Sequence, residues 1–253
     1  MLPYGFNSTW RKPSSSGFVH ASTWPEHNTT ALSINSSLWV CNRMWRCRPG
    51  PRCLPGQRAV HEHQVNKIAS VCFYHIRRLR QIRHHDSREV LKQLVTSLVL
   101  SRLDYCNAIL AGLPASTLMP LQRAQNAAAC LVLGLDRRSS ITTALRDLHW
   151  LPVKHRTTFK VATLMHQALH RRCPAYLADL VAFSSTDSHR QLRSTTTRAA
   201  ARQRTRTQLG RRSFSVCGPD VWNSLPPSVR TVDSNSSFCR ALKTHLFQLA
   251  FNN

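Results

Sequence analysis

Apolar residues recur every three or four positions from residue 64 onward, whereas the residues before it show no such regularity. This spacing is typical of one face of an α-helix. The first apolar stripe consists of Val65, Ile68, Cys72, Ile76, Leu79 and Ile82. It predicts an amphipathic helix over residues 64–83, and the polar positions of that helix carry a group of cations: Lys67, Arg77, Arg78, Arg80 and Arg83.

Two further helices are predicted before residue 135. The stripe Val90–Val99 begins shortly after Asp86, which is a candidate N-cap because its short side chain can accept a backbone hydrogen bond. The next helix is predicted to begin at Ser116 or Thr117 and to end at Gly134, since glycine readily adopts the left-handed conformation of a helix C-cap. Residues 61–135 therefore predict a helical domain.

Helical stripes return after residue 135, and serine or proline marks where each begins. A short helix is predicted to start at Ser140, a longer one at Pro152 and another short one at Pro174. A last helix is predicted to be capped by Ser236 or Ser237. Residues 136–253 are therefore expected to form a helical, basic carboxy-terminal extension.

Three stretches of the chain show no helical period. Residues 1–60 mix Ser, Asn, Pro and four Trp without a repeat, so we expect an unrelated, disordered amino-terminal segment. Residues 184–213 combine many arginines with little apolar material, which favours a basic loop or small hairpin. The apolar residues of 214–225 are expected to form a patch between turns. The overall prediction is a mainly α fold, an irregular helical bundle with a helical extension.

The net charge of the chain indicates a polyanionic partner. The chain carries 35 Lys and Arg against 11 Asp and Glu, a net charge of +24 with an isoelectric point near 11.3. Such an excess repels itself in a compact protein, so an acidic partner is expected. Arginine dominates, and its planar guanidinium suits paired contacts with phosphate. A ribosomal or histone-like protein is equally basic, so charge indicates only the class of partner.

The sequence gives little indication of a membrane-spanning segment, a metal site or a cofactor site. No run of 18 apolar residues occurs, and the amino terminus lacks an apolar signal core, which predicts an intracellular protein of nucleus or cytoplasm. Cys41, Cys47 and Cys53 are spaced more widely than paired zinc ligands, so we expect neither metal nor cofactor. His166 and His170 stand four apart without the Glu of a zinc-protease helix, and we expect them on its polar face.

Six motifs together resemble one protein family. In order they are SRLDYCNAILAGLP (101–114), LQRAQNAAACLVLG (121–134), ITTALRDLHWLPVKHRTTFKV (141–161), PAYLADLV (174–181), GRRSFSVCGPDVWNSLPPSVR (210–230) and FCRALKTHLFQLAF (238–251). This series resembles the region after the polymerase palm in LINE-class, jockey-like non-LTR retrotransposon reverse transcriptases. The resemblance implies that residues 61–135 are a thumb-like helical domain and that 136–253 are the extension behind it.

The chain departs from this family in three respects. Residues 1–60 resemble neither the endonuclease nor the fingers and palm. The sequence has no adjacent Asp-Asp pair and no Tyr-x-Asp-Asp run, whereas an RNA-directed DNA polymerase needs clustered aspartates to hold two Mg²⁺ ions. Cys130 stands where relatives tend to have Arg. We therefore expect no enzymatic activity and no catalytic residues.

The candidate nucleic-acid contacts are the two densest groups of arginine. Arg77, Arg78, Arg80 and Arg83 lie in the thumb-like segment. The second group has few acidic neighbours in the sequence and comprises Arg198, Arg202, Arg204, Arg206, Arg211 and Arg212. Four residues inside the strongest motifs are expected to be structural anchors at helix junctions: Asp104, Tyr105, Trp150 and Trp222.

Three hypotheses about function follow. The first is a truncated reverse transcriptase remnant that binds the backbone of RNA, an RNA–DNA hybrid or DNA without reading its sequence. The second is an inert translation product of a degenerate transposable element. The third is a fragment that polymerises only when a palm domain is supplied in trans. None of them involves a membrane or a small-molecule substrate, and the oligomeric state stays open.

Overall fold

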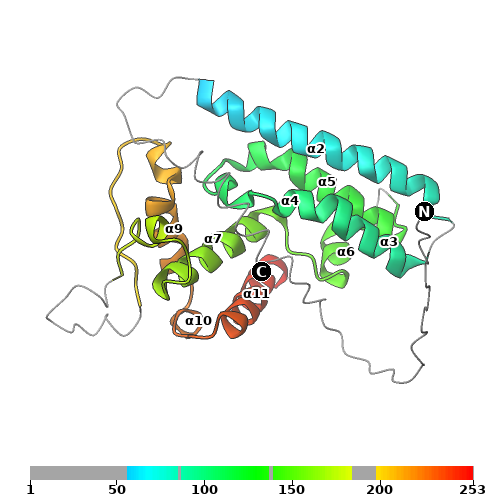
Figure 1. Cartoon of the computed structure of the whole chain (residues 1–253). Helices are drawn as coiled ribbons and strands as arrows, with labels where there is room; N and C mark the ends of the chain where they lie inside the picture. Colours follow the sequence, from blue (N-terminus) through cyan, green and yellow to red (C-terminus); the bar gives the residue numbers. More distant parts are fainter. Residues whose placement is uncertain (1–55, 85–86, 137–138, 184–197, 253) are drawn as a thin grey trace, which may run out of the picture.

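The computed structural model describes residues 56–84, 87–136, 139–183 and 198–252, with side chains from residue 61 onward, and these residues are mainly helical (Figure 1). The helices are α2 (Gly56–Ile82), α3 (Arg88–Val95), α4 (Ser101–Asp104), α5 (Ala115–Leu133), α6 (Ile141–Asp147), α7 (Val153–Leu169), α8 (Ala175–Ala178), α9 (Phe214–Asn223), α10 (Pro227–Arg230) and α11 (Asn235–Phe251). Within the described residues the one β-type pairing is the antiparallel bridge between Phe183 and Ala200.

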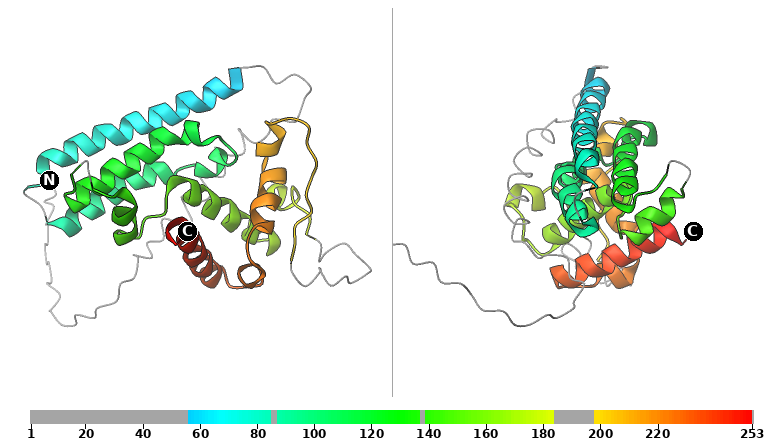
Figure 2. Two further views of the ribbon diagram at one scale, coloured as in Figure 1. Left: turned by 180° about the vertical axis from the view of Figure 1, so that it is seen from behind. Right: turned by 90° about the vertical axis from the view of Figure 1, so that its right-hand side faces the viewer.

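The amino-terminal half is organised around α2 and α5, which lie lengthwise along each other in all views (Figures 1 and 2). The buried stripe predicted for α2 is largely present, with Val65, Cys72, Ile76 and Leu79 all at most 4% exposed. Ile82 is 39% exposed and ends the stripe. The small residues of α5 allow this close approach, since a helix face without long side chains brings backbones together.

A π-helical turn over Thr96–Leu100 joins α3 to α4. It shifts the apolar stripe by one residue, so that Val99 and its neighbour Leu100 are both buried. Val90, which the sequence pattern placed on the stripe, is 43% exposed because only Leu91, one position on, faces the core.

The turn before α7 joins the two halves of the molecule. Gln125, fully buried on α5, donates its side-chain N–H to the carbonyl of Leu151 at 2.8 Å. The amide oxygen of Gln122 accepts the backbone N–H of Val153 at 2.9 Å, which satisfies one of the unpaired donors at the start of α7. The two clusters of buried apolar residues meet at this turn, where Trp150 and Val153 belong to one cluster and Leu151 to the other.

The carboxy-terminal half packs α7 against α9 and α11 (Figure 1). Its largest buried residues include Trp222 and Phe238, whose ring centroids are 5.7 Å apart, and Phe214. Phe247 of α11 packs against both apolar clusters. Helix α11 therefore covers the seam between the two halves, and Arg146 donates a hydrogen bond to the carbonyl of Phe251 at 3.2 Å across that seam.

The starts of several helices differ from their predicted positions. Helix α2 already begins at Gly56, inside the segment that was predicted to be disordered up to residue 60; residues 1–55 lie outside the described residues. Helix α3 is capped by Ser87, whose hydroxyl accepts the N–H of Val90, and Asp86 is also outside the described residues. Helix α11 begins after Ser234, before the predicted caps at 236 and 237.

Helix α5 likewise starts earlier than predicted, directly after Pro114 and without a side-chain cap. The cap expected at Ser116 or Thr117 was therefore wrong, because proline already presets the backbone for a helix start. The predicted end is confirmed: Gly134 adopts the left-handed conformation, with φ of 70°, and donates to the carbonyl of Cys130.

The apolar patch expected in residues 214–225 is the helix α9. Gly218 and Pro219 suggested a turn, yet Phe214, Cys217 and Trp222 share one helical face and are buried. Gly218 is needed at this point because a Cβ there would lie 2.7 Å from the sulfur of Met165 on α7. The prediction failed because close packing against α7 outweighs the local preference of glycine and proline.

Among the described helices, none combines the length and the apolar character that crossing a lipid bilayer requires.

Trp150→Ala should lower the free energy of unfolding by about 3–5 kcal/mol, because the indole is 1% exposed and its removal leaves a cavity. Urea or guanidinium unfolding measures this loss. Tyr176→Ala, at a tyrosine that is 43% exposed, is the control and should change stability by about 0.5 kcal/mol or less. Equal losses in the two variants would contradict the burial of Trp150.

Candidate nucleic-acid interface

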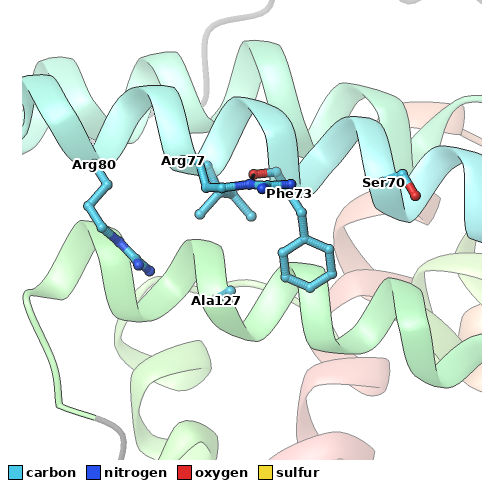
Figure 3. Close-up of a pocket in the computed structure, with 6 residues that line it drawn as sticks. Ser70, Phe73, Arg77, Arg80 and Ala127 are labelled. Carbon is cyan, nitrogen blue, oxygen red and sulfur yellow. Dashed lines mark hydrogen bonds between the residues drawn. The ribbon is translucent and has the colours of Figure 1, made fainter.

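Arg77, Arg78 and Arg80 of α2 and Arg83, which follows the end of α2, do not share one face. Arg77 and Arg80 line a shallow groove between α2 and α5 (Figure 3). Arg78 is exposed and points about 100° away from Arg77, as neighbours on a helix do. The sequence pattern grouped all four because each is polar, but only helix packing shows which side α5 occupies.

The groove has a volume of about 350 Å³ and is lined by Ser70, Phe73, Ile76, Arg77, Arg80 and Ala127. The phenyl ring of Phe73 points from α2 toward α5 (Figure 3). The side chain of Arg80, further along α2, also reaches toward α5. Arg77 lies between them, and its Nε donates to the carbonyl of Phe73 at 3.4 Å. An apolar surface thus lies directly beside two guanidinium groups.

No acidic residue lines this groove. Neither Arg77 nor Arg80 has a carboxylate within ion-pair distance among the residues that the structure describes. Arg123 is exposed on α5, one helical turn before the groove residue Ala127. The groove is therefore a site of uncompensated positive charge.

Arg83 has a different position from Arg77 and Arg80. It is half-buried, and its guanidinium lies so close to Gly134 that a Cβ there would be 2.4 Å from a terminal nitrogen. The C-terminal end of α5 presents carbonyl oxygens and the negative end of the helix dipole to this cation. Arg83 thus stabilises the end of α5.

The second basic region is the segment 198–212, which runs along α9 (Figure 2). Residues 201–205 form neither helix nor strand and follow an extended path beside α9 (Figure 2). Arg202, Arg204 and Arg206 are exposed. Three cations of this short stretch are therefore open to solvent.

Two arginines of this segment have acidic partners. Arg198 pairs with Asp233 at 2.7 Å, and Arg202 pairs with Asp220 at 3.2 Å. The Arg198 guanidinium holds the pKa of the Asp233 carboxyl below its usual value. The expectation of few acidic neighbours was wrong at these two positions, because Asp220 and Asp233 are distant in sequence and are brought close by the fold.

Asn223 holds this segment on α9, a role that the sequence analysis missed. Its side-chain oxygen accepts the N–H of Ala200 at 2.9 Å, and its side-chain nitrogen donates to the carbonyl of the same residue at 2.8 Å. The indole of Trp222 donates to the carbonyl of Arg198 at 2.7 Å. The only signal was the position of Asn223 within the WNSLPP motif.

Arg211 and Arg212 end the segment, and they differ. Arg211 is exposed, whereas Arg212 is half-buried and its side chain packs against Gly112, where a Cβ would lie 3.1 Å from Cγ. Burial lowers the pKa of His61 at the start of α2, and the nearby positive charge of Arg212 lowers it further. Arg212 therefore connects the segment to the first half of the molecule. This connection lies near the start of α2, whereas the groove lies near its other end.

The four expected anchors fall into two classes. Trp150 and Trp222 are buried, at 1% and 0% exposure. Tyr105 is 48% exposed and Asp104 also lies at the surface, so neither is packed in the way that was expected. Asp104 forms an ion pair with Arg156 of α7 at 2.5 Å, which ties the end of α4 to the second half.

His166 is a core residue, which corrects the expectation of a polar-face position. It is 0% exposed, stacks on Phe238 with centroids 4.2 Å apart, and its Nε2 lies 2.9 Å from the carbonyl of Val232. His170 is 4.5 Å away between ring centroids. Burial is the main reason that the pKa of both imidazoles lies below its ordinary value.

The described residues contain no group of three His, Cys, Asp or Glu that could hold a metal ion. Cys41, Cys47 and Cys53 lie outside these residues. Burial raises the pKa of the Cys72 thiol to about 11 and that of Cys217 to about 12. Both thiols are therefore protonated near neutral pH and serve as small apolar packing groups.

The stability of the fold should decrease as the pH falls below about 6.5, the ordinary pKa of histidine. The folded protein binds a proton at His166 less readily than the unfolded chain, so acid favours the unfolded state. The stability that neutral His166 contributes is therefore fully present only above about pH 6.5. Denaturant unfolding between about pH 7.5 and 5 measures the effect, above the range in which carboxylates titrate. His166→Gln should show a weaker pH dependence, and His63→Gln, at an exposed position of α2, should behave like the unaltered protein.

Comparison with protein-family models, with curated proteins and with solved structures finds no match to this chain.

Proposed function

We propose that this chain is a remnant of a retrotransposon-derived reverse transcriptase that binds the backbone of nucleic acids without reading their sequence. The observation that carries this proposal is the groove between α2 and α5, where Arg77 and Arg80 lie together without an acidic partner among the described residues. Guanidinium groups left unpaired at a surface are suited to phosphate oxygens.

The exposed arginines of the extended segment supply a second contact region. Arg204 and Arg206 have no carboxylate partner among the described residues, in contrast to Arg202. Both are exposed and lie close together in the sequence, so they are suited to contact the phosphates of one strand. Because phosphates are identical at every base, such contacts give affinity without sequence preference.

The six ordered motifs support the relation to the reverse transcriptases, and the missing aspartate pair supports a role without catalysis. The partner under this proposal is RNA, an RNA–DNA hybrid or DNA. The groove and the extended segment lie toward opposite ends of α2, so a long polyanion suits them better than a small phosphate compound (Figure 1).

Arg77→Gln combined with Arg80→Gln should weaken binding to all nucleic-acid sequences alike. If the unaltered chain neutralises about five phosphates, the slope of log affinity against log salt is roughly −3.5 to −4.5, and the double variant should be shallower by about 1.4–1.8. Fluorescence anisotropy over a series of salt concentrations measures both slopes. Arg204→Gln with Arg206→Gln should give a similar change.

The control is Arg78→Gln combined with Arg240→Gln, which removes the same charge from exposed positions outside the α2–α5 groove. This variant should keep most of the affinity and the slope. A salt-dependence slope near zero for the unaltered chain would favour an inert protein. Equal losses of affinity in the control and in the Arg77→Gln, Arg80→Gln variant would mean that net charge alone drives binding.

The purified chain should not extend an RNA-templated primer in the presence of Mg²⁺ and deoxynucleotides, because it lacks the clustered aspartates that bind the two metal ions. A primer-extension assay with a complete reverse transcriptase as positive control measures this. Extension that is lost on heating the protein would overturn the proposed absence of catalysis.

A further inference from the structure

The groove between α2 and α5 contains more than is needed to bind phosphate. Its two cations adjoin an apolar surface formed by Phe73, Ile76 and Ala127. Ile76 is 2% exposed, whereas Phe73 packs partly against the core, lines the groove and is only half-buried. A site for phosphate alone gains nothing from a partly exposed aromatic ring, which must stay in contact with water when the site is empty.

The side chains of the groove are arranged to complement the two parts of a nucleotide, its base and its phosphate. Figure 3 shows the ring of Phe73 next to the guanidinium of Arg77, with Arg80 beyond it on the same side of α2. The hydrogen bond from Arg77 to the carbonyl of Phe73 holds this guanidinium beside the ring. A base against the ring would place its phosphates near the two arginines, within a volume of about 350 Å³.

We infer that this groove binds single-stranded nucleic acid, with one base against Phe73 and the adjoining phosphates on Arg77 and Arg80. The inference rests on the proposed function and names the form of nucleic acid that the same site selects. In a duplex the bases are paired and stacked on each other, so their faces are closed to a protein ring, whereas a single strand offers each base for stacking on an aromatic side chain.

The chain supplies matched controls on the same helix. Tyr74 and Arg78 directly follow Phe73 and Arg77, respectively, and both are exposed on another side of α2, with Tyr74 at 55%. Phe73→Leu and Tyr74→Leu each remove one aromatic ring. Arg77→Gln and Arg78→Gln each remove one charge from the full chain.

Binding of a labelled single-stranded oligonucleotide and of its duplex is measured for each variant at one salt concentration. Phe73→Leu should weaken single-strand binding by about five-fold or more, as loss of a base–aromatic stack does, and should leave duplex binding unchanged. Tyr74→Leu should change neither. Arg77→Gln should weaken single-strand and duplex binding together, and Arg78→Gln should weaken either much less.

These outcomes separate the inference from the proposed function. If Phe73→Leu binds single strands like the unaltered chain while Arg77→Gln binds weakly, the stacking inference is wrong and phosphate binding in the groove stands. If Arg77→Gln has no effect either, both are wrong. Equal loss of single-strand and duplex binding in Phe73→Leu would also overturn the inference, since it would indicate a general disturbance of the groove.

A second measurement does not depend on whether Phe73→Leu folds like the unaltered chain. The unaltered protein should change the fluorescence of 2-aminopurine placed in a single strand, because the base moves from its neighbours onto the ring. Abasic oligonucleotides of the same length should bind more weakly than intact ones. Unchanged fluorescence together with equal affinity for abasic strands would contradict a base at Phe73.

Discussion

The buried amide of Gln125 is the interaction on which the arrangement of the two halves depends. It reaches from α5 to the carbonyl of Leu151 and lies where the two apolar clusters meet. The same carbonyl also accepts a hydrogen bond from Nε of Arg156 on α7 at 3.0 Å. An apolar residue of similar size at position 125 would fill the space but remove one of the two bonds to this carbonyl, a loss of about 1 kcal/mol. Gln122 holds the first backbone N–H of α7 close by, and α7 in turn packs against α9 and α11.

The position of α9 determines what the basic segment presents. Asn223 and Trp222 hold the backbone of residues 198–200, and the segment continues beside α9 with Arg202, Arg204 and Arg206 exposed. A chain of this charge works against its own compactness. The fold limits that repulsion because several arginines lie beside negative charge. Arg83 lies at the C-terminal end of α5, Arg156 pairs with Asp104, and Arg198 pairs with Asp233.

The proposed binding of nucleic acid rests on arginines without such structural roles. In the groove, Arg77 and Arg80 adjoin Phe73, and the combination of cation and aromatic ring is more specific than net charge. Charge attracts any polyanion, whereas in the proposed site the ring selects a strand with accessible bases over a closed duplex. The proposed binding and its proposed preference for single strands therefore rest on different side chains of one site.

The sequence by itself determined the mainly helical fold, because helical periodicity is a local property read within a few turns. The stripe of α2 and the cap at Gly134 follow from it directly. Only the tertiary structure decided that residues 214–223 are a helix, that His166 is buried, and which arginines have acidic partners. These features depend on residues far apart in the chain, such as Arg198 and Asp233, whose meeting requires the packing of α7, α9 and α11 and leaves no periodic signal.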